Sequence, residues 1–223
     1  MSGSGRVVHR VPYYAQWESA GLVEEIVAGR LDAADDPLWQ KSGAADAAEY
    51  AFWSWRLCGV ACLRMALDHW RYEVPPALAV AAECLEAGAY VRRGDRVDGL
   101  IYAPFAGYVR RRWGLEAQAR PELDAAEVRE HVAAGGLAML SVHPSIRGLG
   151  PEPPQRGGHL VLAVGVADDA VVIHNPSGFQ GSSQEYVPVS WTDLARFRAE
   201  RGVLLFPPAR RAAPGPGAGE GAG

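Results

Sequence analysis

The chain has 223 residues, of which 48% are hydrophobic and 22% charged. This is the composition of an ordinary globular protein, and the length predicts one domain with a sizeable core. The formal net charge of −4 lacks the basic excess typical of proteins that bind nucleic acid or anionic membranes. No apolar run approaches the roughly 18 residues of a membrane span, and residues 1–10 contain no apolar signal-peptide segment. We therefore expect neither a nucleic acid nor a membrane as a partner.

The chain contains three cysteines, Cys58, Cys62 and Cys84. An odd, small number of cysteines without an export signal is typical of reduced thiols, so we expect a cytoplasmic protein. There is no CxxC motif, and no group of histidines and cysteines has the spacing of zinc ligands. The sequence implies neither a metal nor an organic cofactor, and it leaves the oligomeric state open.

The ends of the chain differ from its middle. Residues 11–17 (VPYYAQW) predict an extended segment, and the acidic, alanine-rich residues 18–50 predict an insertion with one or two short helices. Residues 207–223 are rich in Pro, Gly and Ala and have almost nothing to bury, so they predict a disordered tail. We thus expect a single domain over residues 1–206.

Helices are expected first along the chain. Val60, Leu63, Leu67 and Trp70 recur at three- and four-residue spacing after Leu57, which places them on one helix face. Prolines at the start and glycines at the end favour further helices over residues 75–88 and 104–113. Asp124 and Glu127 form a capping box for a fourth helix, over residues 124–134.

Strands follow the helices. Residues 137–142 form a short apolar run, 144–158 a loop rich in proline and glycine, and 159–166 and 171–174 a predicted hairpin. A short helix capped by Ser190 and Asp193 precedes a final strand over residues 202–206. Helices followed by an antiparallel sheet predict the α+β class.

Three polar residues stand at the ends of these predicted elements. Cys58 begins the first long helix, where unpaired N–H groups and the helix dipole favour a thiolate and lower its pKa. His159 opens a strand and could serve as proton acceptor and donor, while Asn175 ends the neighbouring strand and could orient that histidine. Whether His159 and Asn175 meet depends on the strand register, which the sequence does not fix.

The residues around these three positions resemble a known family. CGVACLRMAL from Cys58, GGHLVLAVG around His159, the Asn175-Pro176-x-Gly178 turn and the opening VPYYAQ are similar to motifs of the bacteriocin-processing, double-glycine peptidases. These form family thirty-nine of the cysteine peptidases and have a papain-like fold. The resemblance covers roughly residues 10–206. It implies that Cys58 is the nucleophile, His159 the base and acid, Asn175 the orienting residue and Gln16 the oxyanion donor.

The sequence also departs from the family pattern. In many relatives the glutamine lies one or two helical turns before the cysteine, but here 41 residues lie between Gln16 and Cys58. Phe52 occupies the position of the closer glutamine, and Gln40 is a rival to Gln16. Asn175 replaces the usual aspartate, and an amide can orient a histidine equally well.

Other candidate residues have simpler interpretations. Cys62 and Cys84 are expected in the core. His174 is next to Asn175, but strand alternation directs it to the opposite face, and His143 either lines the cleft or lies in a turn.

The resemblance and the residue pattern together predict a papain-like cysteine peptidase or amidase that cleaves an amide bond in a peptide or a small acyl substrate through a thioester. Two alternatives stay open at this point. The thioester could be released to an amine, which would make the protein an acyl- or peptidyl-transferase, or the fold could be a binding module without catalysis.

Overall fold

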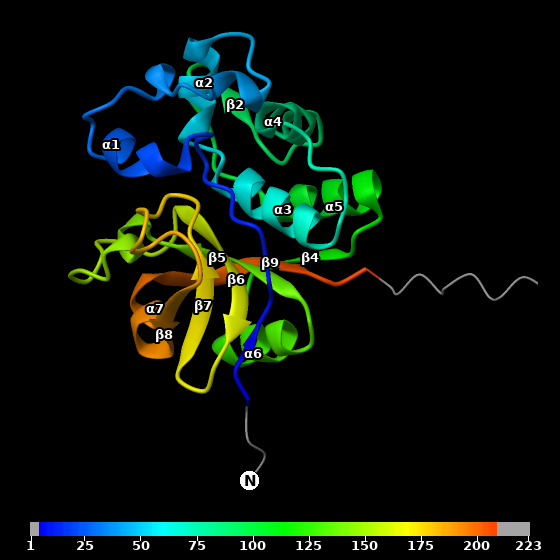
Figure 1. Cartoon of the computed structure of the whole chain (residues 1–223). Helices are drawn as coiled ribbons and strands as arrows, with labels where there is room; N and C mark the ends of the chain where they lie inside the picture. The colour runs from blue at the N-terminus through cyan, green and yellow to red at the C-terminus, as the bar shows by residue number, and fades with distance from the viewer. Residues whose placement is uncertain (1–4, 209–223) are drawn as a thin grey trace, which may run out of the picture.

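The computed structural model describes residues 5–208. Its main sheet has seven strands, all paired antiparallel, in the order β4-β9-β5-β6-β7-β8, with β1 paired to β6. Helices α1–α5 gather on one side of the sheet, and α6 and α7 lie on the other (Figure 1). This mixed arrangement of helices and antiparallel strands confirms the predicted α+β class.

The helices on the first side come from the N-terminal half of the chain. They are α1 (Val23–Val27), α2 (Ala47–Ser54), α3 (Cys58–His69), α4 (Ala77–Glu86) and α5 (Tyr102–Trp113). α3 carries the expected apolar face, because Val60, Leu63 and Leu67 are fully buried, and it packs on β6 and β5. The helix ends at His69, one residue before the Trp70 that we expected on the same face.

The strands of the main sheet are β1 (Val7–Val8), β4 (Ala117–Arg120), β5 (Leu137–Val142), β6 (His159–Val166), β7 (Ala170–His174), β8 (Val187–Ser190) and β9 (Arg198–Leu205). β5, β6 and β7 match the predicted strands closely. The last strand begins at Arg198 rather than at the predicted Gly202, and its pairing with β5 shifts register between Leu140 and Val142. A small separate hairpin joins β2 (Arg92–Arg93) to β3 (Arg96–Val97).

Two helices cover the far face of the sheet, α6 (Ala125–Ala133) and α7 (Trp191–Phe197). Both begin with the predicted caps: the Asp124 side chain accepts a hydrogen bond from the Glu127 N–H, and Ser190 accepts one from the Asp193 N–H. Such caps satisfy N–H groups that a helix terminus leaves unpaired. Their apolar side chains form a second core cluster, separate from the cluster that includes α3.

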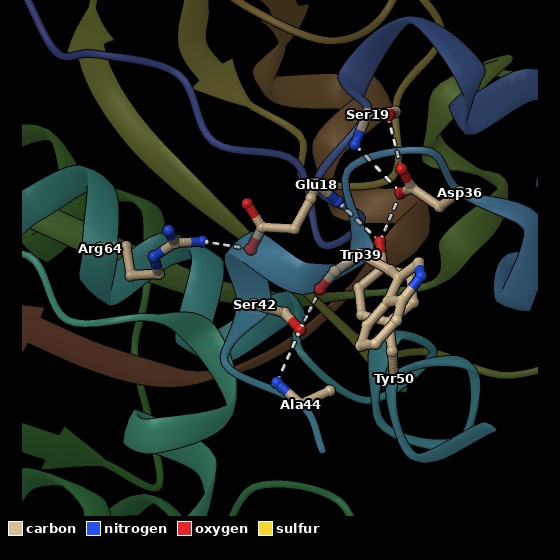
Figure 2. A network of polar contacts seen from close by, with 8 residues as sticks. All are labelled: Glu18, Ser19, Asp36, Trp39, Ser42, Ala44, Tyr50 and Arg64. Atoms are coloured by element: carbon tan, nitrogen blue, oxygen red, sulfur yellow. Dashed lines mark hydrogen bonds and ion pairs between the residues drawn. The ribbon is translucent and has the colours of Figure 1, made fainter. Parts of the chain in front are cut away.

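The segment 18–50 contains one short α-helix and the start of a second, in line with the expected one or two short helices. It has three 3-10 turns, η1 (Ala20–Leu22), η2 (Ala33–Asp35) and η3 (Trp39–Ser42), besides α1 and the start of α2. Polar contacts hold it in place, and Figure 2 shows a group of them around the buried Asp36. Of the predicted tail, residues 209–223 lie outside the described residues. No helix within residues 5–208 is long and apolar enough to span a membrane.

Candidate active site

The first component of the site is the start of α3. Cys58 is the first residue of this helix and is partly exposed, whereas Cys62, one turn further on, is fully buried. Gly59 fits here because it has no side chain: a Cβ atom at this position would lie 2.6 Å from Leu100 Cδ2 and 3.1 Å from Leu160 Cδ1. The helix terminus that carries the thiol is therefore closely covered by neighbouring chain segments.

The sheet provides the second component. β6 begins at His159 beside α3, and the Cys62 thiol donates a hydrogen bond to the Leu160 carbonyl, with an S···O distance of 3.7 Å. Gly157 and Gly158 precede the histidine with φ angles of 85° and 96°, a region that glycine adopts without strain. Cys58 and His159 line the same cavity, whose volume is about 510 Å³, within the usual size range of ligand pockets.

The strand register brings Asn175 to His159. Leu162 lies opposite His174 in the β6–β7 pair, so the turn after β7 runs alongside the start of β6. His159 Nε2 and Asn175 Oδ1 are 2.8 Å apart, and both residues are buried. The Ser177 N–H also donates to Asn175 Oδ1, which fixes the orientation of the amide. Because an amide oxygen can only accept, Nε2 carries the imidazole proton, and Nδ1 remains free to act as a base.

Gln16 reaches the site from the N-terminal segment. Its backbone N–H donates to the Pro176 carbonyl, and its Nε2 donates to the Ser54 carbonyl at 3.1 Å, four residues before Cys58. The side chain is buried, and its Oε1 atom has no partner within the described residues. The rival Gln40 is exposed in η3. Of the two glutamines, Gln16 is the one placed between the end of α2, just before Cys58, and the turn that carries Asn175.

Burial determines the charge state of the pair. Desolvation raises the pKa of the Cys58 thiol, although backbone hydrogen bonds from Leu160, Gly59 and Cys58 itself oppose this effect. The helix-terminal N–H groups of Cys58 and Gly59 thus lower this pKa as expected, but burial outweighs them, and the expected net shift to a lower pKa is wrong. Desolvation also lowers the pKa of His159 to about 4, assisted by the nearby charge of Arg147 and opposed by the bond to Asn175. Near neutral pH the unliganded site holds a neutral thiol and a neutral imidazole.

Two residues that the sequence did not indicate complete the histidine's surroundings. The Ser177 hydroxyl lies 3.1 Å from His159 Nε2 and 3.3 Å from Asn175 Oδ1. Arg147, in the 3-10 turn η4 (Pro144–Arg147), donates to that hydroxyl at 2.9 Å. Ser177 could have been suspected from its place in the Asn-Pro-Ser-Gly turn. No local signal distinguishes Arg147 from the other arginines.

The remaining histidines near the site have other surroundings. His174 is fully buried between the rings of Tyr13 and Tyr186, and neither ring nitrogen has a partner among the described residues. His143 caps η4 by accepting a hydrogen bond from the Ser145 N–H, so it lies in a turn rather than in the cavity wall. Cys62 and Cys84 are fully buried, as expected. Within residues 5–208 no group of three or more potential metal ligands is present.

The N-terminal segment is anchored next to Gln16 by two polar contacts (Figure 2). Glu18 and Arg64 form an ion pair at 3.1 Å, with side chains only 12% and 10% exposed. The Asp36 carboxylate accepts hydrogen bonds from the Ser19 hydroxyl and from Tyr50, each at 2.5 Å. The first contact ties the segment to α3, and the second ties it to residues 36–50.

No family model and no curated protein matches this chain. Among solved structures, it is similar to the crystal structure of a protein from Bacillus anthracis described as a putative C39-like peptidase. The match covers 71% of this chain and 90% of that protein, with a TM-score of 0.50 and 14% sequence identity. At this identity the similarity shows the fold: the chain shares its architecture with a C39-like peptidase structure.

Proposed function

We propose that the chain is a papain-like cysteine peptidase or amidase that cleaves an amide bond through a thioester on Cys58. The observation that carries the proposal is that a helix-terminal thiol and a histidine line one cavity, and that an asparagine is hydrogen-bonded to the same histidine. His159 and Asn175 are 2.8 Å apart, and Cys58 lines the cavity beside His159. The architecture shared with a C39-like peptidase structure supports the same class of reaction.

The proposed reaction starts from a neutral Cys58 thiol and a neutral His159 imidazole. His159 Nδ1 takes the thiol proton as the Cys58 sulfur attacks the carbonyl carbon, and the C–N bond breaks as the imidazolium returns that proton to the leaving amine. Water then hydrolyses the thioester, with His159 again as the base. Asn175 keeps the imidazole in the tautomer that leaves Nδ1 unprotonated.

Gln16 is the proposed oxyanion donor. An amide nitrogen carries two N–H groups, and the bond to the Ser54 carbonyl uses one of them. The second N–H and the backbone N–H of Cys58 would stabilise the charge on the tetrahedral intermediate. A donor of this kind is worth about 3 kcal/mol of transition-state stabilisation, so we expect Gln16→Ala to lower kcat by about a hundredfold.

The test is acylation of the folded protein by a thiol-directed acyl probe, followed by peptide mass analysis. We expect the label on Cys58, no label in Cys58→Ala, and unchanged labelling in the matched control Cys62→Ala. Rates of thioester release to water and to an added amine then separate a hydrolase from an acyltransferase. Labelling that is absent from Cys58, or that is unaffected by His159→Ala, would contradict the proposal.

A further inference from the structure

The cavity beside Cys58 has two arginines in its wall, Arg56 and Arg201. Within residues 5–208 neither of them forms an ion pair with an acidic side chain. The one acid in the described wall, Asp98, is 3.0 Å from Arg93, which neutralises its charge. The wall thus carries two uncompensated positive charges in a protein whose formal net charge is −4.

Arg56 is held in a defined orientation. Its guanidinium lies 4.1 Å from the centre of the Phe52 ring, and one of its N–H groups donates to the Phe52 carbonyl. Four of the five N–H donors of a guanidinium remain after such a bond. An arginine that is oriented by a carbonyl and a ring loses less conformational freedom when it binds an anion.

Arg201 reaches the cavity wall from β9. Its Nη2 atom lies 3.2 Å from the position that a Cβ atom of Gly157 would occupy, so it lies close to the chain segment leading into His159. Arg56 precedes Cys58 by two residues, and Gly157 precedes His159 by two residues. Arg56 therefore belongs to the segment that carries the proposed nucleophile, and Arg201, from β9, lies beside the segment that carries the proposed base.

The same wall contains exposed apolar surface. Trp55 is 51% exposed and Ile101 40% exposed, and both line the cavity. Large apolar side chains with this exposure next to charged donors suit a ligand that has a short aliphatic stem and an anionic end. A carboxylate is the anion that a guanidinium binds with two parallel hydrogen bonds.

We infer that this site selects substrates that carry a carboxylate side chain within two residues of the scissile amide, such as glutamyl or aspartyl peptides. The inference rests on the proposed function, since it names the substrate class of the same cavity. Arg56 and Arg201 would pair with the carboxylate, and Trp55 and Ile101 would contact its methylene groups. A glutamine or lysine at the same substrate position would leave both guanidinium groups without a counter-charge.

The test uses a panel of fluorogenic peptide amides that differ only in Glu, Gln or Lys at each of the two residues before the amide. We expect kcat/KM to be about tenfold higher for Glu than for Gln, the factor for one charged hydrogen bond, and the preference to weaken at high salt. Arg56→Gln and Arg201→Gln should each remove most of the preference, and Arg201→Glu should favour Lys. Arg56→Lys should retain part of it, and Arg96→Gln, an exposed change outside the cavity wall, should leave it unchanged.

A binding experiment keeps this inference separate from the proposed function. Calorimetry with the Cys58→Ala variant and the same peptides measures affinity without any chemical step. Tighter binding of the Glu peptide, lost in Arg201→Gln, supports the inference even if no thioester forms. Equal affinity and equal kcat/KM for Glu and Gln peptides would overturn it, while acylation of Cys58 in that case would leave the proposed function intact.

Discussion

Replacing Asp36 by asparagine tests how the segment 18–50 is held. Each carboxylate oxygen accepts two hydrogen bonds: Oδ1 from the Ser19 hydroxyl and the Leu38 N–H, and Oδ2 from the Ser19 N–H and the Tyr50 hydroxyl. The side chain is fully buried. In either orientation of its amide, an asparagine places an NH2 group where one of the two carboxylate oxygens was. An NH2 group cannot accept, so the two hydrogen bonds donated to that oxygen are lost.

Hydrogen bonds to charged groups contribute roughly 1.5–3 kcal/mol each, and hydroxyl donors can turn towards other acceptors. We therefore expect Asp36→Asn to lower the free energy of unfolding by about 3 kcal/mol. For a domain of this size, that corresponds to a fall in Tm of roughly 2–4 °C per kcal/mol. Urea denaturation at pH 7 measures this loss as a lower midpoint concentration, because the dependence of the free energy on urea should not change.

The neighbouring Asp35 supplies the matched control. It is the last residue of η2, directly before Asp36, is exposed and forms no side-chain hydrogen bond with the described residues. Asp35→Asn should alter stability by no more than about 0.5 kcal/mol, as surface substitutions usually do. If both variants unfolded at the same urea concentration, the hydrogen bonds to the Asp36 carboxylate would not stabilise the segment, and the reasoning from buried charged acceptors would be refuted.

Three further perturbations address the site and its surroundings. Gly59→Ala places a methyl group 2.6 Å from Leu100 Cδ2, so we expect a several-fold loss of acylation rate that Leu100→Ala restores; no rescue would argue against the steric cause. Arg147→Met removes the positive charge that lowers the pKa of His159, so the acid limb of the pH–rate profile should move to higher pH, and an unmoved limb would contradict this role. Burial lowers the pKa of His174 to about 4, so the unfolded state binds more protons than the folded state between about pH 4 and pH 6.5. His174 alone should therefore lower stability by about 3 kcal/mol as the pH drops through that window, in addition to the loss from His159, whose pKa is also about 4. His174→Phe should remove the His174 part of this loss in acid denaturation monitored by circular dichroism.

Much of the architecture could be predicted because its signals are local. The spacing of Val60, Leu63 and Leu67 is enough to predict the buried face of α3, and the Asp124 cap is sufficient to locate the start of α6. β4 and β8 were missed because their sequences, AQAR and VPVS, are short and not strongly apolar. Both strands lie at the edges of the sheet, where neighbouring strands rather than intrinsic propensity determine the structure.

The candidate site likewise has features that the local sequence indicates and features that residues distant in sequence determine. The predicted hairpin made a contact between His159 and Asn175 possible but left it open, because the register is set by contacts that the hydrophobic pattern alone does not reveal. The direction of the Cys58 pKa shift was wrong because the prediction considered only the helix terminus. The burial that raises this pKa involves neighbours such as Leu100 and Leu160, which are distant in sequence.

The N-terminal segment connects the two halves of the molecule at the proposed site. Val7 and Val8 pair with β6, and the Gln16 N–H then bonds to the Pro176 carbonyl while its side chain bonds to the Ser54 carbonyl (Figure 1). The chain that brings Gln16 to the Ser54 carbonyl therefore crosses from the sheet to the helices in a single run. The 41 residues between Gln16 and Cys58 need not move the glutamine away from the site. Its position is fixed by the preceding segment, which runs from the pairing with β6 to the Ser54 carbonyl. An insertion after this crossing can lengthen the chain without changing the geometry around the thiol.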